Sequence, residues 1–311
     1  MTNFFVPHIF MTSSTILFLA LLRRRLIIPA TLIWLLAGIP FVVVADEHGP
    51  LLSSGGVVLR TGTFNVMSEN RNFSDLARQI RAEELDIASF QEVGSNFWSR
   101  SLKSLADYPE TSLRNGVNSA NSVVISRLPL DEVTMLPGTE RQARWPLLSR
   151  AVLAKLVAIA LDGMPAQAVA YFSIHPETPR DPSRWRSRNA YLDAVAVEIA
   201  KLPVGTHVVV AGDFNTPPWS PFFQDFLKRT GLRDAAQSPW PAPTRAFREF
   251  GLPPSLGTPV DHILVSAEIT VSDFRNGSDY GSDHLPLIAT LLLGHKTEEE
   301  TGISARTPML P

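Results

Sequence analysis

The 311-residue sequence contains no cysteine and is almost balanced in charge. Without cysteine, neither a disulfide framework nor a thiolate metal site can form. The formal net charge is only −2, so no global positive field draws the chain onto nucleic acid. A local basic patch would still suffice for a nuclease. No internal repeat or low-complexity block appears.

Hydrophobic residues are plentiful, at 45% of the chain, whereas charged residues make up 19%. This composition allows a sizeable core and excludes a disordered chain. The length fits one α/β domain of roughly 250 residues with an appendage. The apolar residues are concentrated in the first 45 positions, which therefore form the appendage.

The appendage holds two apolar stretches, 4–22 and 26–45, separated by Arg23-Arg24-Arg25. The second stretch has about 20 residues without a charge, which is enough to cross a hydrocarbon core. We therefore expect one or two transmembrane helices, with the arginines on the cytoplasmic side. The alternative is a signal peptide cleaved near Ala45. Either way the rest of the chain is exported, as a domain on the extracytoplasmic side of the membrane or as a secreted protein.

The remaining sequence is predicted to comprise a linker at 46–56, a folded domain at 57–294 and a flexible tail at 295–311. In the domain, β-rich runs alternate with amphipathic segments, which favours an α/β sandwich with layered sheets over strict βαβ units. The predicted strands are 57–66, 85–93, 123–126, 152–160, 169–174, 207–211, 260–266 and 285–293. The predicted helices are 74–81, 185–201 and a third that begins at Ser220-Pro221 and ends at Gly231.

Acidic, amide and histidine side chains recur where these strand-like runs meet loops. A buried strand delivers its terminal residue to the rim of the sheet, where ligands bind in α/β folds. Oxygen ligands without cysteine suit Mg²⁺, Mn²⁺ or Ca²⁺ rather than zinc. The residues are Asn65, Glu92, His175, Asp213, Asn215, Asp261, Asp283 and His284.

Each of these short motifs, taken alone, is also compatible with an ordinary turn or cap. His262 fits a core or a surface position. The cluster of Arg184, Trp185, Arg186 and Arg188 fits either a phosphate-binding patch or a solvated helix face, and the solvated face is the default. The ordered set of motifs is what independent turns would not supply by chance.

That set, FN…QE…HP…GDFN…DHI…SDH from Thr63 to His284, resembles the endonuclease/exonuclease/phosphatase superfamily. The superfamily includes DNase I-like nucleases, abasic-site endonucleases, sphingomyelinases and inositol-polyphosphate 5-phosphatases. Together with the apolar N-terminus, the motifs look most like its membrane-attached bacterial members. The resemblance implies a four-layer α/β/β/α sandwich and a Mg²⁺ (or Mn²⁺) cofactor.

The resemblance also implies roles for the site residues. Glu92 would bind the metal, with Asp283 and Asn65 close to it. Asp213 would activate water, and Asn215 would hold water or a phosphate oxygen. His284, oriented by Asp261, would donate a proton or hydrogen bond, and His175 would be a second phosphate-facing histidine.

The implied activity is hydrolysis of a phosphoester by in-line attack of water, with nucleic acid as the first substrate class. The alternatives are a phospholipid head group, a soluble phosphomonoester, or a catalytically silent membrane-tethered binding module. No tyrosine lies between Asn115 and Ser126, which disfavours the abasic-site branch. No obligate protein partner is evident, and spacing assigns no acidic partner to His175.

Overall fold

The computed structural model describes Thr12 and residues 57–94, 105–112, 121–136, 151–159, 167–238, 241–247 and 256–294. Apart from Thr12, the expected spans at 4–22 and 26–45 lie outside these residues, as do the linker and the tail. Among the helices formed by the described residues, none is both long and apolar enough to cross a membrane. The membrane anchor therefore stays a prediction.

Two mixed six-stranded sheets form the centre of the domain. The first has the order β11-β12-β1-β2-β4-β3, and the second has the order β5-β6-β7-β8-β10-β9. The first sheet consists of β1 (Val57–Asn65), β2 (Ile87–Val93), β3 (Glu110–Thr111), β4 (Asn121–Ser126), β11 (Ile269–Asn276) and β12 (Leu287–Leu293). The second consists of β5 (Leu130–Met135), β6 (Val152–Ile159), β7 (Gln167–Ile174), β8 (His207–Asp213), β9 (Arg233–Asp234) and β10 (Asp261–Val265).

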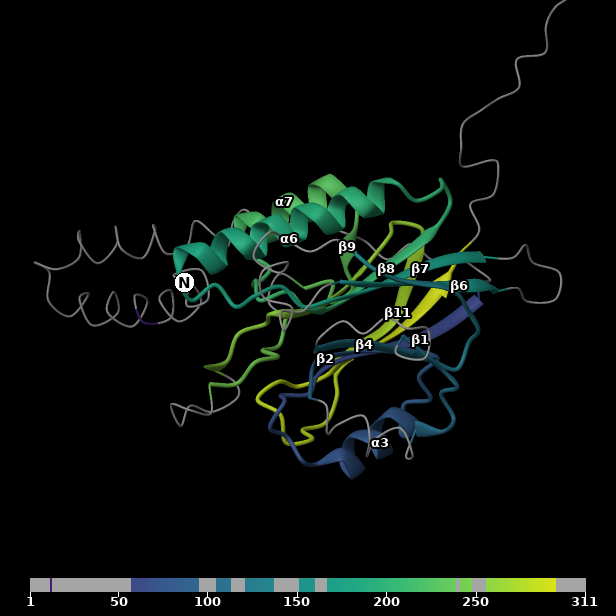
Figure 1. Cartoon of the computed structure of the whole chain (residues 1–311), viewed down its shortest axis with the longest axis horizontal. Coiled ribbons are helices and arrows are strands. Elements are labelled where there is room, and N and C mark those ends of the chain that lie inside the picture. Colours follow the sequence, from purple (N-terminus) through teal and green to yellow (C-terminus); the bar gives the residue numbers. More distant parts are fainter. Residues whose placement is uncertain are drawn as a thin grey trace, which may run out of the picture.

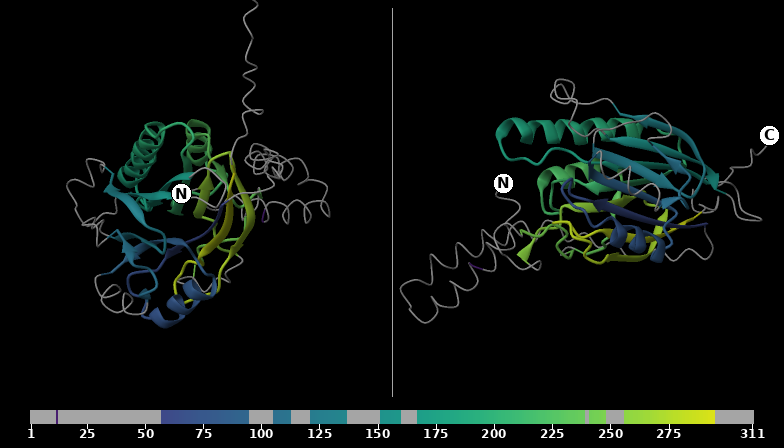
Figure 2. Two further views of the ribbon diagram at one scale, coloured as in Figure 1. Left: turned by 90° about the vertical axis from the view of Figure 1, so that its right-hand side faces the viewer. Right: turned by 60° about the horizontal axis from the view of Figure 1, so that its bottom comes forward.

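The two sheets pack face to face, and helices cover their outer faces (Figures 1 and 2). Buried aliphatic side chains such as Leu59, Val209 and Leu291 fill the space between the sheets. Helix α3 (Phe73–Ala82) lies on the first sheet, and α6 (Pro182–Ala200) and α7 (Pro221–Thr230) lie on the second. The domain is therefore the layered α/β sandwich that the sequence predicts.

Local interactions determine where helix α6 begins and where helix α7 ends. Asp181 caps α6 by accepting hydrogen bonds from the backbone N–H groups of Ser183 and Arg184. The sequence prediction, which began this helix at Trp185, was wrong by one turn because it missed this cap. Helix α7 ends at Gly231, whose left-handed φ of 69° lets its N–H bond to the Leu227 carbonyl at 2.9 Å.

The strands predicted from the sequence are all present within a few residues of their predicted bounds. The prediction missed β5 and β11, which lie at the edges of the two sheets, and the two-residue strands β3 and β9. Strand β5 contains no fully buried residue, and β11 buries only Ile269 completely. An edge strand with little burial lacks the apolar pattern that reveals a strand in sequence.

Candidate active site

The predicted site residues meet at one edge of the sandwich, the left end in Figure 1. Strands β1 and β2 are parallel to each other, as are β7 and β8, so the carboxyl ends of all four reach this edge. The antiparallel strands β10 and β12 begin there. The topology thus gathers Asn65, Glu92, His175, Asp213, Asp261 and His284 from distant parts of the sequence.

A glycine and a strained asparagine shape the turn after β8. At Gly212, φ is +152°, and an added Cβ would lie 2.0 Å from the carbonyl oxygen of Ile174 on β7. Only glycine allows this close approach of two neighbouring strands. Asn215 follows with φ +48°, which is uncommon outside glycine. The backbone N–H of Asn215 donates to Asp213 Oδ1 at 2.7 Å, and this bond holds the Asp213 carboxylate against the turn.

Glu92 owes its position to an irregularity in β2. The pairing of β2 with β4 shifts register between Gln91 and Val93, and Glu92 adopts φ +56°. Such bulges re-aim a side chain next to a functional site. Gln91 accepts a hydrogen bond from Thr63 Oγ1 at 3.1 Å inside the sandwich, whereas Glu92 is partly exposed at the site.

His284 forms a buried chain of charged groups with two aspartates. Its Nδ1 lies 2.8 Å from Asp261 Oδ2, and its Nε2 lies 4.0 Å from Asp213 Oδ2. Asp261 and Asp213 are direct partners across β10 and β8. All three side chains are almost completely buried. Asp261 therefore fixes the ring of His284, and Nε2 faces the site.

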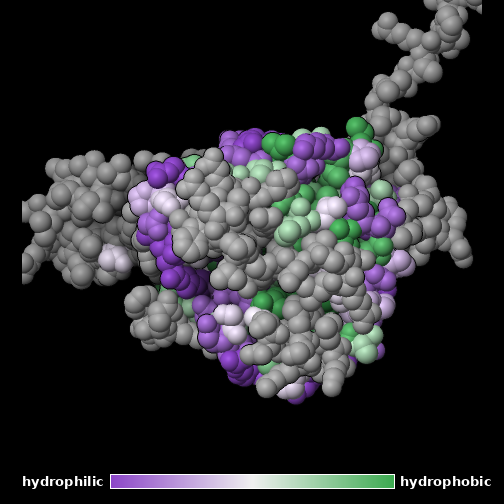
Figure 3. Space-filling model, in the orientation of Figure 1, coloured by the Kyte–Doolittle hydropathy of each residue, from purple (hydrophilic) through white to green (hydrophobic). Residues whose placement is uncertain are grey.

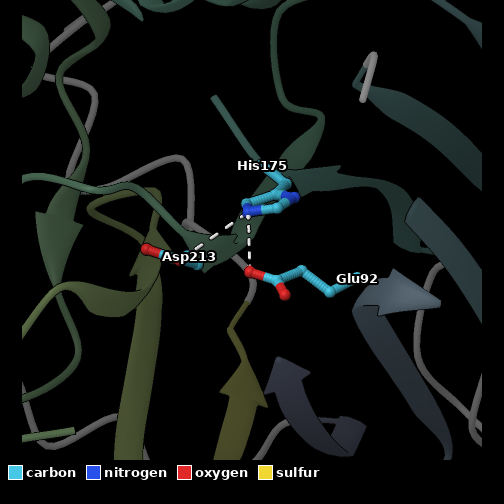
Figure 4. Close-up of side chains that lie close together, drawn as sticks. All are labelled: Glu92, His175 and Asp213. Atoms are coloured by element: carbon cyan, nitrogen blue, oxygen red, sulfur yellow. Dashed lines mark ion pairs between the residues drawn. The ribbon is translucent and has the colours of Figure 1, made fainter. Parts of the chain in front are cut away.

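His175 lies between Glu92 and Asp213 (Figure 4). Its Nε2 is 3.7 Å from Glu92 Oε1 and 3.8 Å from Asp213 Oδ2. The ligand atoms of these three residues lie within 4.8 Å of one another, so they could hold a metal ion. Asp213, Asp261 and His284 form a second such group among the described residues.

Asn65 joins the two carboxylates of the site. Its Nδ2 donates to Glu92 Oε1 and to Asp213 Oδ2, each at 3.1 Å, while its Oδ1 accepts from the Met67 backbone N–H. As placed, Nδ2 donates to both carboxylates, and Oδ1, which accepts one hydrogen bond, keeps a second lone pair. The role of Asn65 as a metal ligand stays a prediction.

Asp283 stands apart from the other predicted ligands. Its Oδ2 is 3.6 Å from Arg245 Nε, and its carboxylate belongs to neither of the two clusters among the described residues that could hold a metal. The segment around Arg245 pairs with the loop that carries Asp283, since Ala246 N–H donates to the Asp283 carbonyl. This places Asp283 at the rim, and its predicted metal role stays a prediction.

Burial and charge set the protonation of the central pair. Burial raises the pKa of Asp213 to about 6, and the Asp261 carboxylate acts in the same direction. Burial alone would lower the pKa of His284, but the carboxylates of Asp261 and Asp213 outweigh it and raise that pKa to about 9. Asp213 is thus a base that titrates just below neutral pH, and His284 is an imidazolium beside it.

Several supporting residues escaped the sequence analysis. The hydroxyls of Tyr280 and Ser282 donate to the Asn65 carbonyl at 2.6 and 2.7 Å, and the Tyr191 hydroxyl accepts from the His175 N–H at 3.0 Å. Ser282 belongs to the SDH motif, which gave a signal for it. The two tyrosines act on backbone groups of distant residues, and no sequence pattern indicates such contacts.

The surface at this end of the domain is hydrophilic. In Figure 3, polar residues gather along the left-hand edge of the described surface, whereas hydrophobic residues show in its right half.

The carboxylates and histidines at this edge of the two-sheet sandwich are groups suited to binding a cation and to transferring protons. The chain belongs to the endonuclease/exonuclease/phosphatase family, which it matches over residues 62–284. The members of this family are phosphoester hydrolases. The family inferred from the motifs is therefore confirmed, while the membrane-attached bacterial type stays a prediction. No protein with a curated description matches the chain.

Solved structures similar to this one share the fold at low sequence identity. An endonuclease/exonuclease/phosphatase from Bacteroides vulgatus is 17% identical, with a TM-score of 0.60, and the match covers 76% of this chain and all of the other. D. rerio TDP2 complexed with a single-strand DNA product is 17% identical (TM-score 0.57; 75% and 98% covered). Sphingomyelinase C from Streptomyces griseocarneus is also 17% identical (TM-score 0.54; 75% and 99% covered).

Proposed function

We propose that the protein is a divalent-metal-dependent phosphodiesterase with nucleic acid as its first substrate class. The observation that carries this proposal is the convergence of His284 and His175 on Asp213, with their Nε2 atoms 4.0 and 3.8 Å from its Oδ2. One buried carboxylate between two imidazoles can take a proton from water while an imidazolium gives one to the departing oxygen.

The residues present fit a divalent cation. Glu92 and Asp213 offer carboxylate oxygens and His175 offers an imidazole nitrogen, all within one cluster. Carboxylates suit Mg²⁺, and a mixed carboxylate and imidazole set also suits Mn²⁺. Glu92 is the principal ligand candidate because it is the more exposed of the two carboxylates. When bound, the cation would polarise the phosphoryl oxygen and offset charge on the leaving group.

The side chains of the site divide the proton transfers of hydrolysis between them. Asp213 Oδ2 accepts a proton from the attacking water as the new phosphorus–oxygen bond forms. His284 Nε2 donates a proton to the leaving oxygen as the opposite phosphorus–oxygen bond breaks. Asp261 keeps the His284 ring oriented and charged. The Nδ2 of Asn215 donates to the Pro176 carbonyl at 3.0 Å and to Asp213 Oδ2 at 3.2 Å, and its Oδ1 is the atom that can hold the attacking water.

A phospholipid head group is the second substrate class, and the N-terminal sequence favours it. The charge-free stretch at 26–45 would tether the domain beside lipid, on the extracytoplasmic side of a bacterial inner membrane. Fusing alkaline phosphatase after Ala45 tests the location: an active fusion is expected, and an inactive one would contradict export. A silent binding module would lack some of the site residues, but all of them are present.

A substrate panel on the full-length protein tests the proposal. Single-stranded DNA, plasmid DNA, RNA, sphingomyelin vesicles and inositol phosphates are each assayed with Mg²⁺, with Mn²⁺ and with EDTA. His284→Ala should be inactive, while His207→Gln, which alters a histidine at the opposite end of β8, should keep full activity. Hydrolysis that resists EDTA, or that survives in His284→Ala, would overturn the mechanism.

A further inference from the structure

The turn after β8, residues 213–216, is held in a strained conformation by more than its own hydrogen bonds. Asn215 has φ +48°, which costs free energy for a residue with a side chain. Such a conformation persists only where the surroundings enforce it. The carbonyls of Asn215 and Thr216, which are consecutive along the chain, each accept a hydrogen bond from a basic side chain of another element.

Arg188, on α6, holds the first of these carbonyls. Its Nη1 donates to the Asn215 carbonyl oxygen at 3.2 Å, and its Nε and Nη2 both donate to Asn189 Oδ1. The guanidinium carbon lies 5.5 Å from the centre of the Phe222 ring. Arg188 is only 3% exposed, so the prediction of a solvated helix face is wrong at this position.

The burial of Arg188 is unusual because none of the described residues offers it a carboxylate. Within the part of the chain that the structure describes, its contacts are with neutral oxygens and an aromatic ring. Burial lowers its pKa to about 10, which still leaves it charged at neutral pH. A buried cation without an anionic partner is destabilising, and its presence beside a candidate active site points to a functional use.

His262, on β10, holds the second carbonyl from the other side of the turn. Its Nε2 lies 2.9 Å from the Thr216 carbonyl oxygen, and its Nδ1 lies 2.7 Å from Asp234 Oδ2. Nε2 donates to the Thr216 carbonyl, which can only accept, and Nδ1 lies against a carboxylate. The ring is buried and packs against Phe223, with centroids 4.2 Å apart.

We propose that Arg188 and His262 are positioning residues that clamp the 213–216 turn and thereby hold the Asn215 amide against Asp213 for phosphoester hydrolysis. This inference rests on the proposed function. Two basic side chains, one from α6 and one from β10, donate to consecutive carbonyls and so hold the turn from two different elements. The amide of Asn215, which is bonded to Asp213, then cannot drift from its place in the transition state. A misplacement of about 1 Å at such a position costs roughly a hundredfold in rate.

Hydrogen exchange of the turn tests the clamp without relying on activity. In the full-length protein, Arg188→Met should speed exchange in the peptide spanning 213–216 by about tenfold or more, because a loosened turn opens the bond from the Asn215 N–H to Asp213 Oδ1 more often. Arg188→Lys keeps the charge but cannot reach both acceptors, and it should show a smaller increase. Arg229→Met removes an exposed arginine of α7 and should change nothing there. Unchanged exchange in both Arg188 variants would overturn the clamp.

Kinetics then test whether the clamp acts through Asn215. Arg188→Met and His262→Phe should each lower kcat by about tenfold or more and change KM by less than about threefold, because the ground-state complex is little affected. The double variant Arg188→Met/Asn215→Ala should be no slower than Asn215→Ala alone. Losses that multiply would show that Arg188 does not work through Asn215, and the proposal would fall.

The two proposals fail in distinguishable ways. If the wild-type protein hydrolysed no substrate of the panel while Arg188→Met still loosened the turn, the proposed function would fall and the clamp would stand as a structural device. If the wild-type protein were active and both Arg188 variants kept its kcat and its exchange rates, the clamp alone would fall.

Discussion

The two histidines of the site face the same carboxylate but are held in different ways. The side chain of His284 is 3% exposed, and its Nδ1, the ring nitrogen that points away from Asp213, is bonded to the buried carboxylate of Asp261. His175 is 14% exposed, its backbone N–H is bonded to Tyr191, and its Nε2 lies between two carboxylates. The fixed and charged ring of His284 suits the proposed role of proton donor, whereas the more exposed ring of His175 suits the proposed contact with a cation or a phosphate.

The largest effect that separates the two histidines is expected from His284→Ala. Loss of a general acid typically costs 10²–10⁴ in rate, so kcat should fall by about 10³-fold with little change in KM. Steady-state kinetics on the substrate identified by the panel measures this change. His207→Gln serves as the control, since His207 is a buried histidine that contacts the Gly294 carbonyl far from the site. A loss below about tenfold would mean that His284 is not the proton donor.

Asp261→Asn should act through His284 and show itself in the pH profile. The wild-type pKa of His284, about 9, is held up against burial mainly by Asp261. Without that carboxylate the pKa of His284 should fall below the ordinary value of about 6.5. At a pH about two units above that value, roughly 1% of the molecules would carry a protonated His284. The activity of Asp261→Asn at about pH 8.5 should therefore be about 10²-fold below that of the wild type, and the loss should be smaller at acidic pH.

The measurement for Asp261→Asn is the alkaline limb of log kcat against pH, which should move to lower pH. Asp193→Asn removes an exposed carboxylate that pairs with Arg229, and it should leave the limb in place. An unchanged limb in Asp261→Asn would break the link between Asp261 and the charge of His284.

His175→Gln should have a smaller effect, which depends on the metal. Loss of a hydrogen bond to a charged group corresponds to about tenfold in kcat/KM. Because His175 belongs to the cluster that could hold a cation, the half-saturating Mn²⁺ concentration should rise more than that of Mg²⁺. Titration of activity with each ion measures this. Equal shifts for both ions would place His175 on the phosphate rather than on the metal.

Sequence reasoning reached the layered fold and the list of site residues because both leave local patterns. Buried strands such as β8 read as unbroken apolar runs, and the polar residue that ends each run marks the rim of a sheet. Edge strands such as β11 have no such pattern, because few of their side chains are buried.

The sequence could not reveal how the site residues are oriented. The turn of Glu92 into the site depends on a bulge in β2, and the amide of Asn65 is directed by Met67. The burial of Arg188 depends on where α6 rests against the 213–216 turn. These features arise from tertiary contacts between segments far apart in the chain, and a residue pattern along one segment does not encode them.

The smallest expected effect is the change of folding stability with pH. It tests the charge of His284 without relying on catalysis. The pKa of His284 in the folded protein is raised to about 9, so its protonation contributes stability that is complete below about pH 6.5 and is lost as pH rises through about 9. A difference of about 2.5 pH units corresponds to at most about 3 kcal/mol.

The test is urea unfolding in EDTA, with free energies compared at several pH values. The difference between the wild-type protein and His284→Gln should shrink by up to about 3 kcal/mol between pH 6.5 and 9, while His207→Gln should run parallel to the wild type. Burial also raises the pKa of Asp213, to about 6. The stability that comes from protonated Asp213 is therefore already lost when the pH has risen through about 6, below the range in which His284 titrates. The loss between pH 6.5 and 9 therefore belongs to His284. A flat difference across that range would mean that the ring is neutral in the folded protein, which would leave the site without its proton donor and make the two histidines equivalent.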